Sequence, residues 1–295
     1  MTNGVKEMSM KTQKRKRVFA LILALALTLT VFTGCEKKPA KSGDSASVLS
    51  AAEEHARKRS KADQKQLKQD IEDGYLILVN KENFLPSDYI PEDLEELKYY
   101  AKDRSPDARY LKETAAEHFH EMVEAAQEEN IDIVSTTAYR SYEFQKNLYD
   151  YYVKTKGQEE ADKVSAKPGT SEHQTGLVAD LSTSEINYVN GSAFGNSKAG
   201  KWIAEHSWEY GFIVRYPEGL EDITGYTYEP WHVRYVGLVA AKEIHDEDIT
   251  LEEYIEENHL GNSIKKVVSE ARNDDETDDN DGEDSSSDKS VKEKK

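Results

Sequence analysis

The stretch SEHQTGLVAD, residues 171–180, places a histidine and an aspartate seven positions apart, with a glycine between them. Imidazole nitrogens and carboxylate oxygens are both common zinc ligands, and each must come within about 2 Å of the ion. A fully extended run of seven residues spans roughly 23 Å, at about 3.3 Å per residue. One metal can therefore bind both His173 and Asp180 only if the chain reverses between them, and Thr175-Gly176 is where it could do so.

A second histidine that suits a metal lies in EPWHVRYVG, residues 229–237. A catalytic zinc takes three protein ligands and keeps a fourth position for water, whose pKa it lowers to about 7. His173, Asp180 and His232 would supply the three ligands. Glu229 is the candidate general base, which would take the proton of the water and pass it to a leaving amine. The alternative is a hydrogen-bonded polar cluster in the core, which either motif alone would favour.

The spacing of Glu229 and His232 conflicts with a regular strand, in which residues three apart point to opposite faces. Pro230 cannot donate to a strand ladder, so we expect the backbone to break register there and bring both side chains to one side. The remaining histidines have simpler explanations: different helix sides for His118 and His120, a packed position in the helix that carries Trp208 for His206, and a charged surface for His55, His245 and His259.

The elements that would carry these residues follow from apolar periodicity and from local start and stop signals. Ser141 is a candidate N-cap, Gly211 a helix stop, and Thr250 with Glu253 a capping box. Helices gather early and strands late, which predicts an α+β fold with helices packed on a small antiparallel sheet, in one domain over residues 71–262. Strands are predicted at 75–80, 131–140, 212–216 and 231–236, and helices at 108–130, 142–154, 197–211 and 250–258.

The N-terminus has the pattern of a secretory signal. A basic run at 11–17 precedes an apolar stretch at 18–32 that is too short for a comfortable transmembrane span, so residues 1–34 are interpreted as a signal peptide. The chain's single cysteine, Cys35, follows at the place where a bacterial lipoprotein is cleaved and lipidated. The alternative is an uncleaved signal anchor with an incidental cysteine.

Two further segments are expected to lie outside the folded domain. Residues 35–70 are predicted to be a flexible or partly helical tether, and residues 263–295 a disordered acidic tail that cannot bury enough apolar surface to fold. The net charge of the whole chain is −18. An acidic surface repels phosphate backbones, which argues against binding of nucleic acid.

The two metal motifs together resemble the paired S-x-H-x-x-G-x-A-x-D and E-x-W-H signatures of the VanY-type zinc D-alanyl-D-alanine carboxypeptidases, a group that includes the L,D-carboxypeptidases and D,D-dipeptidases of bacterial cell walls. The similarity extends to TAYRSYEFQ at 137–145 and DITGYTYEPWH at 222–232. It implies one zinc ion per chain, held by His173, Asp180 and His232, with Glu229 as acid and base.

The resemblance also implies a substrate, the stem peptide of peptidoglycan, which would lose a terminal D-alanine. A carboxypeptidase must recognise a free carboxylate, and the planar fork of arginine binds one in bidentate fashion. By resemblance, Arg140 anchors this carboxylate or stabilises the oxyanion; the alternative is an ion pair with one of the chain's many acids. Gln145 and Ser171 are further candidates for substrate hydrogen bonds, although Gln145 could simply be solvated and Ser171 could only hold the loop.

Two other functions stay open at the level of the sequence. An L,D-carboxypeptidase would act on tetrapeptide stems, and the shape of the pocket would decide this. A non-catalytic wall-binding lipoprotein is the alternative of a different class, and the intact Glu229 argues against it because a binding module needs no general base. With a lipid on Cys35, the protein is expected outside the cytoplasm, anchored to the outer face of the cytoplasmic membrane.

Overall fold

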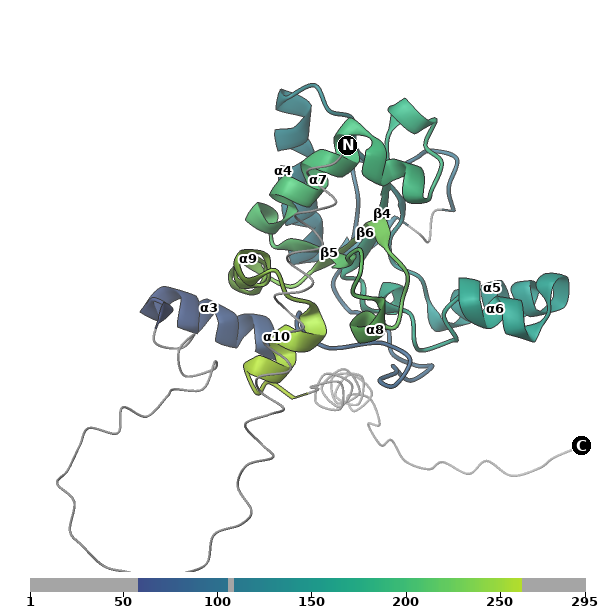
Figure 1. Ribbon diagram of the computed structural model, residues 1–295, viewed down its shortest axis with the longest axis horizontal. Coiled ribbons are helices and arrows are strands. Elements are labelled where there is room, and N and C mark those ends of the chain that lie inside the picture. Colours follow the sequence, from purple (N-terminus) through teal and green to yellow (C-terminus); the bar gives the residue numbers. More distant parts are fainter. Residues whose placement is uncertain (1–57, 106–108, 262–295) are drawn as a thin grey trace, which may run out of the picture. The chain divides into compact units, whose positions relative to one another are not determined.

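The computed structural model describes residues 58–105 and 109–261. Its central element is a four-stranded antiparallel sheet of order β3-β4-β6-β5. A separate antiparallel pair, β1 with β2, precedes it in the chain. The predicted α+β fold with a small antiparallel sheet is confirmed (Figure 1). The strands are β1 (Leu94–Glu96), β2 (Tyr110–Lys112), β3 (Val134–Thr137), β4 (Val178–Ser182), β5 (Phe212–Tyr216) and β6 (Glu229–Tyr235).

Helices surround this sheet, and short 3-10 turns join several of the elements. The α-helices are α3 (Lys61–Glu72), α4 (Glu113–Glu128), α5 (Tyr142–Lys156), α6 (Gln158–Val164), α7 (Lys198–His206), α8 (Glu221–Thr224), α9 (Leu238–Glu247) and α10 (Leu251–Glu257). The 3-10 turns are η2 (Glu172–Thr175), η3 (Ser184–Ile186), η4 (Ser192–Asn196) and η5 (Ser207–Tyr210).

The two faces of the sheet have different chemistry. Successive side chains of a strand point to opposite faces. Ala179 and Leu181 of β4 and Val233 of β6 join the main core, where they pack with apolar side chains of α4 and α7. Asp180 lies between Ala179 and Leu181, and its cross-strand partner His232 directly precedes Val233, so both point to the opposite face. Alternation along β4 and β6 thus separates an apolar face, covered by helices, from a face that carries polar side chains.

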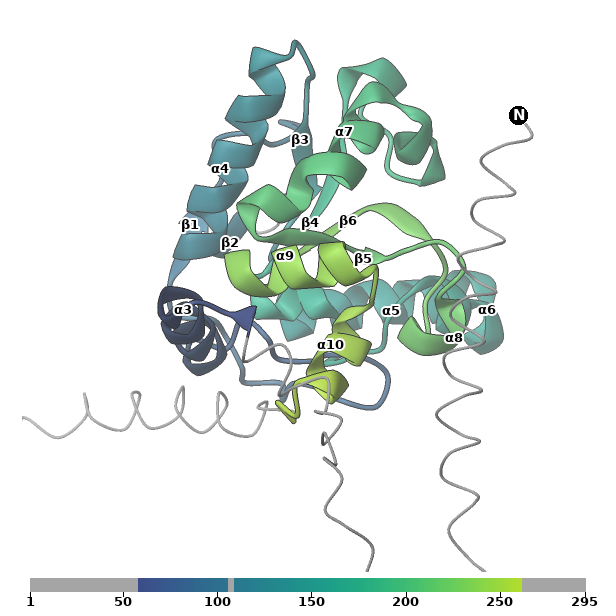
Figure 2. The same ribbon diagram turned by 60° about the vertical axis from the view of Figure 1, so that its left-hand side comes forward.

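A second apolar cluster joins the two ends of the described chain. Leu67 of α3, Ile244 of α9 and Tyr254 of α10 are buried in it together with Ile213 of β5, and the three helices lie close together in Figure 2. Because Leu67 is part of this cluster, the folded domain begins before residue 71, earlier than the tether predicted for 35–70 allows.

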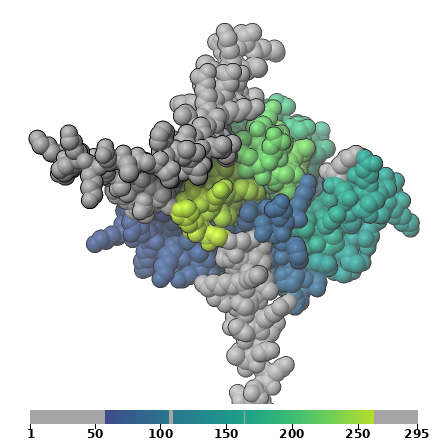
Figure 3. Space-filling view, turned by 60° about the horizontal axis from the view of Figure 1, so that its bottom comes forward, coloured from purple at the N-terminus to yellow at the C-terminus, as the bar shows by residue number. Residues whose placement is uncertain are grey.

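Helices α5 and α6 form a hairpin that projects from the sheet (Figure 1) and appears as the teal lobe at one edge of the surface in Figure 3. Ser141 caps α5 as predicted, accepting a hydrogen bond from the backbone N–H of Phe144. Gln145, one turn into α5, is the buried side chain of this helix. The base of the hairpin therefore faces the protein while most of its length is exposed.

Several predicted elements differ from the structure. The strand predicted at 75–80 is wrong: the carbonyls of Tyr75 and Ile77 accept hydrogen bonds from the buried guanidinium of Arg234 instead of pairing with a strand. The strand predicted at 131–140 is shorter, because Ala138 and Arg140 make hydrogen bonds to His173 instead of extending the pairing with β4.

The helix boundaries were predicted with mixed success. The helix expected at 108–130 begins only at Glu113, because Tyr110–Lys112 pairs with β1. The helix expected at 197–211 changes to a 3-10 turn after His206, and Gly211 ends it with a φ of 78°, as predicted. The capping box of Thr250 and Glu253 opens α10, also as predicted.

Within residues 58–105 and 109–261, no helix is long and apolar enough to cross a membrane. The predicted signal peptide at 1–34, Cys35 and the acidic tail at 263–295 lie outside the described residues.

Candidate active site

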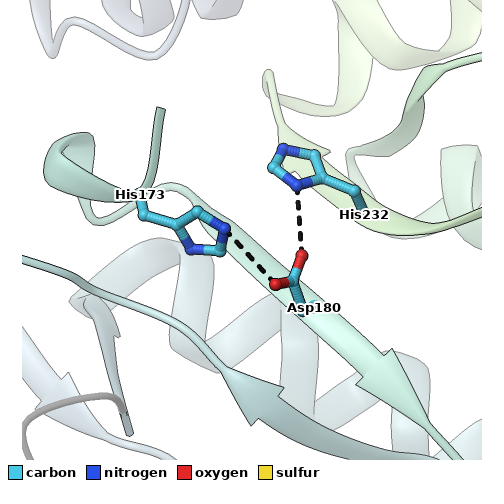
Figure 4. Close-up of side chains that lie close together, drawn as sticks. All are labelled: His173, Asp180 and His232. Atoms are coloured by element: carbon cyan, nitrogen blue, oxygen red, sulfur yellow. Dashed lines mark hydrogen bonds and ion pairs between the residues drawn. The ribbon is translucent and has the colours of Figure 1, made fainter. Parts of the chain in front are cut away.

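The structure brings His173, Asp180 and His232 together. Asp180 in β4 and His232 in β6 are direct cross-strand partners, and His173 lies in the turn η2, after which the chain reverses at Gly176 with a φ of 70°. Dashed lines join the Asp180 carboxylate to both imidazole rings in Figure 4: its oxygens are 3.5 Å from Nε2 of His173 and 3.1 Å from Nδ1 of His232. The three ligand atoms lie within 4.8 Å of one another.

These residues fit a zinc ion. Nδ1 of His173 is 2.7 Å from the carbonyl oxygen of Ala138. A carbonyl can only accept, so Nδ1 carries the proton and Nε2 keeps its lone pair, directed toward Asp180. All three side chains are buried, with 5 to 8% of their residue surface exposed. Two imidazoles and one carboxylate form a ligand set typical of catalytic zinc sites.

Glu229 lies beside the same cluster because of an irregular pairing at Pro230. Val214 of β5 is opposite Val233, but Tyr216 is already opposite Glu229, so β6 holds two extra residues between these pairs. The expected break in register is confirmed. As a result, Oε2 of Glu229 lies 3.6 Å from Nδ1 of His232.

The environment of Glu229 suits proton transfer. Burial, together with the charge of Asp180, raises the pKa of the Glu229 carboxyl to about 7, although the neighbouring His232 and Arg140 act in the opposite direction. A group whose pKa lies near neutral pH can both take up and release a proton under those conditions. The carboxyl is thus suited to act as a general base and then as a general acid.

Arg140 lies beside the histidines because the backbone N–H of Arg140 donates to the carbonyl of His173, at 3.1 Å. Its side chain lines a cavity of about 210 Å³ that also contains Ser171, Glu229 and the three ligand residues. The Nη1 group of Arg140 donates to Oε1 of Gln145 at 2.7 Å, whereas Nε has no hydrogen-bond partner among the described residues. Arg140 therefore has donors left for a ligand in the cavity.

Gln145 and Ser171 occupy different places relative to this cavity. Ser171 lines it, next to the turn that carries His173. Gln145 is buried behind Arg140 and does not line the cavity. Its amide N–H groups donate to Ser165 Oγ and to the carbonyl of Ala166, at 3.2 and 2.6 Å, and its oxygen accepts from Arg140. In this structure Gln145 thus supports Arg140 and is not solvated.

A larger cavity of about 670 Å³ adjoins the first. The two share Val164, Ser165 and Ala166, at the end of the α5–α6 hairpin, and Tyr226 on the other side. Tyr226 stacks on Tyr216, with 4.6 Å between ring centroids, and the Tyr216 ring lies 4.8 Å from that of His232. The metal cluster therefore lies at the narrow end of a longer depression.

Sequence reasoning missed a buried charge cluster behind His232. Oε1 of Glu172 accepts from Arg215 Nε and from Arg234 Nη1, both at 2.9 Å. Burial alone would raise the pKa of Glu172, but the two guanidinium charges hold it well below its usual range. The signal was present: Glu172 directly precedes His173, Arg215 interrupts the otherwise apolar strand β5, and Arg234 lies two residues after His232 in β6.

The other described histidines do not join the metal cluster. Nε2 of His120 accepts from the backbone N–H of Lys98, and His118 stacks on Tyr235. His206 packs on Trp202, as expected for a packed histidine rather than a ligand, and Trp208 stacks on His245.

Comparisons with known proteins agree with this geometry. A family model described as "VanY: D-alanyl-D-alanine carboxypeptidase" matches residues 108–238. The putative carboxypeptidase YodJ of Bacillus subtilis (strain 168) is 37% identical over 280 residues, which cover 86% of this chain and 100% of that protein.

Two solved structures resemble the chain. One, of the LD-carboxypeptidase LdcB, is 44% identical with a TM-score of 0.60, and the match covers 63% of this chain and 87% of that one. Another, of a mutant of the vancomycin-resistance D,D-pentapeptidase VanY in complex with Zn(II), is 34% identical with a TM-score of 0.51, over 61% of this chain and 98% of that one. The chain is therefore an enzyme of the VanY family of D-alanyl-D-alanine carboxypeptidases.

Proposed function

We propose that this enzyme hydrolyses the bond to the terminal D-alanine of pentapeptide stems in peptidoglycan, with one zinc ion per chain. The observation that carries the proposal is the meeting of three kinds of group in one cavity: a His-Asp-His ligand set, a buried carboxyl and an arginine with free donors. These are the groups that hydrolysis of a peptide with a free terminal carboxylate requires.

Each residue has a separate task in the reaction. Zinc held by His173, Asp180 and His232 would polarise the scissile carbonyl and lower the pKa of a water molecule. The water would then lose a proton more easily and attack the carbonyl carbon. Glu229 takes the proton of that water on its carboxylate and delivers it to the nitrogen of the leaving D-alanine as the carbon–nitrogen bond breaks. Arg140 binds the terminal carboxylate, or the oxyanion that forms on the carbonyl oxygen.

The two adjoining cavities support a substrate longer than a dipeptide. The terminal residue would occupy the cavity of about 210 Å³, which contains Arg140 and the ligand residues. The preceding residues of the stem would then extend past Ser165 and Tyr226 into the cavity of about 670 Å³. An enzyme that accepts only a free dipeptide has no need for this second space.

An L,D-carboxypeptidase acting on tetrapeptide stems is the second candidate function. The observation in its favour is the similarity to the LD-carboxypeptidase LdcB, which is greater in both identity and TM-score than the similarity to the D,D-pentapeptidase VanY. Both reactions use the same zinc-assisted hydrolysis and differ in the configuration of the residue before the scissile bond.

The test is D-alanine release by the full-length enzyme on matched pentapeptide and tetrapeptide stems, with zinc and with a chelator. Zinc-dependent release from the pentapeptide alone is the expected result, and release from the tetrapeptide alone would replace it with the L,D-activity. Glu229→Gln is the matched control, since it should abolish release while zinc remains bound. No release from either stem by the zinc-loaded enzyme would contradict both candidates and favour a non-catalytic wall-binding protein.

A second part of the proposal concerns where in the cell the enzyme acts. We propose that the enzyme is a lipoprotein, exported through residues 1–34 and held at the outer face of the cytoplasmic membrane by a lipid on Cys35. The basic and apolar runs that precede this cysteine support it. Metabolic labelling with a radioactive fatty acid should mark the wild-type protein but not Cys35→Ser, and equal labelling of both would exclude Cys35 as the lipidated residue.

A further inference from the structure

We propose that Glu172 is a positioning residue for the metal ligand His232, and that two buried arginines and helix α10 hold Glu172 in place. The inference rests on the proposed function in one respect, namely that His232 binds the metal. It concerns the side of the imidazole that faces away from the metal cluster, where the reaction itself needs no group.

The two histidine ligands use opposite ring nitrogens. His173 donates from Nδ1 to the carbonyl of Ala138 and presents Nε2 to the cluster. His232 presents Nδ1, which lies 3.1 Å from Asp180. A neutral imidazole that binds a metal through one nitrogen carries its proton on the other. His232 must therefore carry a proton on Nε2, and this N–H is buried.

Glu172 is the acceptor within reach of that proton. Oε2 of Glu172 lies 3.7 Å from Nε2 of His232, and neither atom has a hydrogen-bond partner among the described residues. A buried N–H without an acceptor destabilises the folded protein, so a small rotation that closes this gap is favourable. Outer carboxylates of this kind orient a metal-bound imidazole and make it a stronger ligand. His173 has only a neutral carbonyl in the same role.

Two arginines bind one carboxylate oxygen of Glu172 and leave the other available to accept from His232. Both Arg215 and Arg234 donate to Oε1, and the three side chains are fully buried. Their charges stabilise the carboxylate at this depth, where a lone charge would be costly. Since Oε1 accepts both hydrogen bonds, Oε2 remains directed at His232.

The arginines connect this carboxylate to distant parts of the chain. Arg215 donates from Nη1 and Nη2 to the two oxygens of Glu252 in α10, at 2.8 and 2.6 Å. Arg234 donates to the carbonyls of Tyr75 and Ile77, at 3.0 and 2.9 Å. The last helix and the segment at 75–77 thereby hold a side chain that contacts a metal ligand, although neither lines the cavity.

The test measures the zinc affinity of the full-length protein by competition with a chromogenic chelator. In Glu172→Gln, the amide can still accept from the arginines through its oxygen, but its N–H groups then face the N–H of His232. We expect zinc to bind about 10–100-fold more weakly, the usual cost of losing an outer partner of a metal ligand. Asp70→Asn is the matched control, because Asp70 is also buried but lies outside the metal cluster, and its zinc affinity should equal that of the wild type.

Two further readouts separate positioning from a general loss of structure. The metal-free Glu172→Gln protein should keep a cooperative thermal unfolding transition, and the visible absorption spectrum of its cobalt(II)-substituted form should differ from that of the wild type. Wild-type zinc affinity and an unchanged cobalt spectrum in this variant would overturn the inference.

If Glu172→Gln does not fold, Glu252→Gln provides the decisive measurement, because Glu252 lies at the partly exposed end of the cluster. It should weaken zinc binding severalfold, and wild-type affinity in this variant would overturn the inference. These affinities need no substrate, so a wild-type protein that binds zinc but releases no D-alanine would contradict the proposed function and leave this test intact.

Discussion

Replacement of Arg140 by alanine tests how the enzyme recognises its substrate. A guanidinium has five N–H donors. Gln145 accepts from only one of them, on Nη1, and Arg140 lines the cavity, so donors remain there for the two oxygen atoms of a carboxylate. A hydrogen bond to a charged group contributes about 1.5–3 kcal/mol. Two of them give about 3–6 kcal/mol, and we therefore expect kcat/KM to fall about 10²–10⁴-fold.

The assay compares a peptide that ends in a free D-alanine carboxylate with its C-terminal amide, in the wild type and in Arg140→Ala. If Arg140 anchors the carboxylate, the loss occurs on the free acid, and the amide, already a poor substrate, changes little. If Arg140 stabilises the oxyanion, both peptides lose activity by the same factor, because both reactions form that charge.

Controls exclude indirect effects of this substitution. Arg104→Ala removes a surface arginine whose hydrogen bond goes to the carbonyl of Tyr188, and it should leave kcat/KM unchanged. Arg140→Lys keeps the charge but not the planar fork, so an intermediate loss is expected. A fall of less than tenfold on both peptides in a zinc-loaded Arg140→Ala enzyme would refute both roles of Arg140.

Three more predictions concern the metal and the stability of the fold. Removal of zinc should abolish D-alanine release and lower Tm, and added zinc should restore both; full activity in metal-free enzyme would contradict the role of the His-Asp-His cluster. Gly211→Ala should lower Tm more than Gly219→Ala. Both glycines have a positive φ, 78° and 81°, but a Cβ on Gly211 would lie 2.7 Å from the Tyr235 ring, whereas open space surrounds Gly219; equal losses would show that the contact does not matter. Asp70→Asn should raise Tm more at pH 7 than at pH 4. Burial raises the pKa of Asp70, so its contribution to stability is present below the unfolded value of about 3.9 and is lost as pH rises through the folded pKa. A pH-independent gain in Tm would contradict this.

Features that depend on neighbouring residues were predictable from the sequence. The caps at Ser141 and Thr250 form hydrogen bonds within one helical turn, and the stop at Gly211 needs only a residue that tolerates a positive φ. The register break at Pro230 follows from a missing N–H in the same way. Each of these signals acts over a few residues, so tertiary contacts do not reverse it.

Features that depend on a distant partner were not predictable. The apolar run at 75–80 suits a strand, but only the fold shows that its carbonyls meet Arg234, more than 150 residues later in the chain. In the same way, the helix expected from residue 108 gave way to β2 because a partner strand, β1, lies beside it.

In the candidate site, too, some features were predictable from the sequence and others depended on distant partners. The types and spacing of His173, Asp180 and His232 were enough to select them as candidate metal ligands, because a zinc site needs those chemical groups whatever the fold. The role of Glu172 depended on tertiary structure, since its partners Arg215 and Arg234 lie 43 and 62 residues away. A buried ion pair requires that both charges leave water together, and the sequence specifies the charges but only the packed sheet brings them into contact.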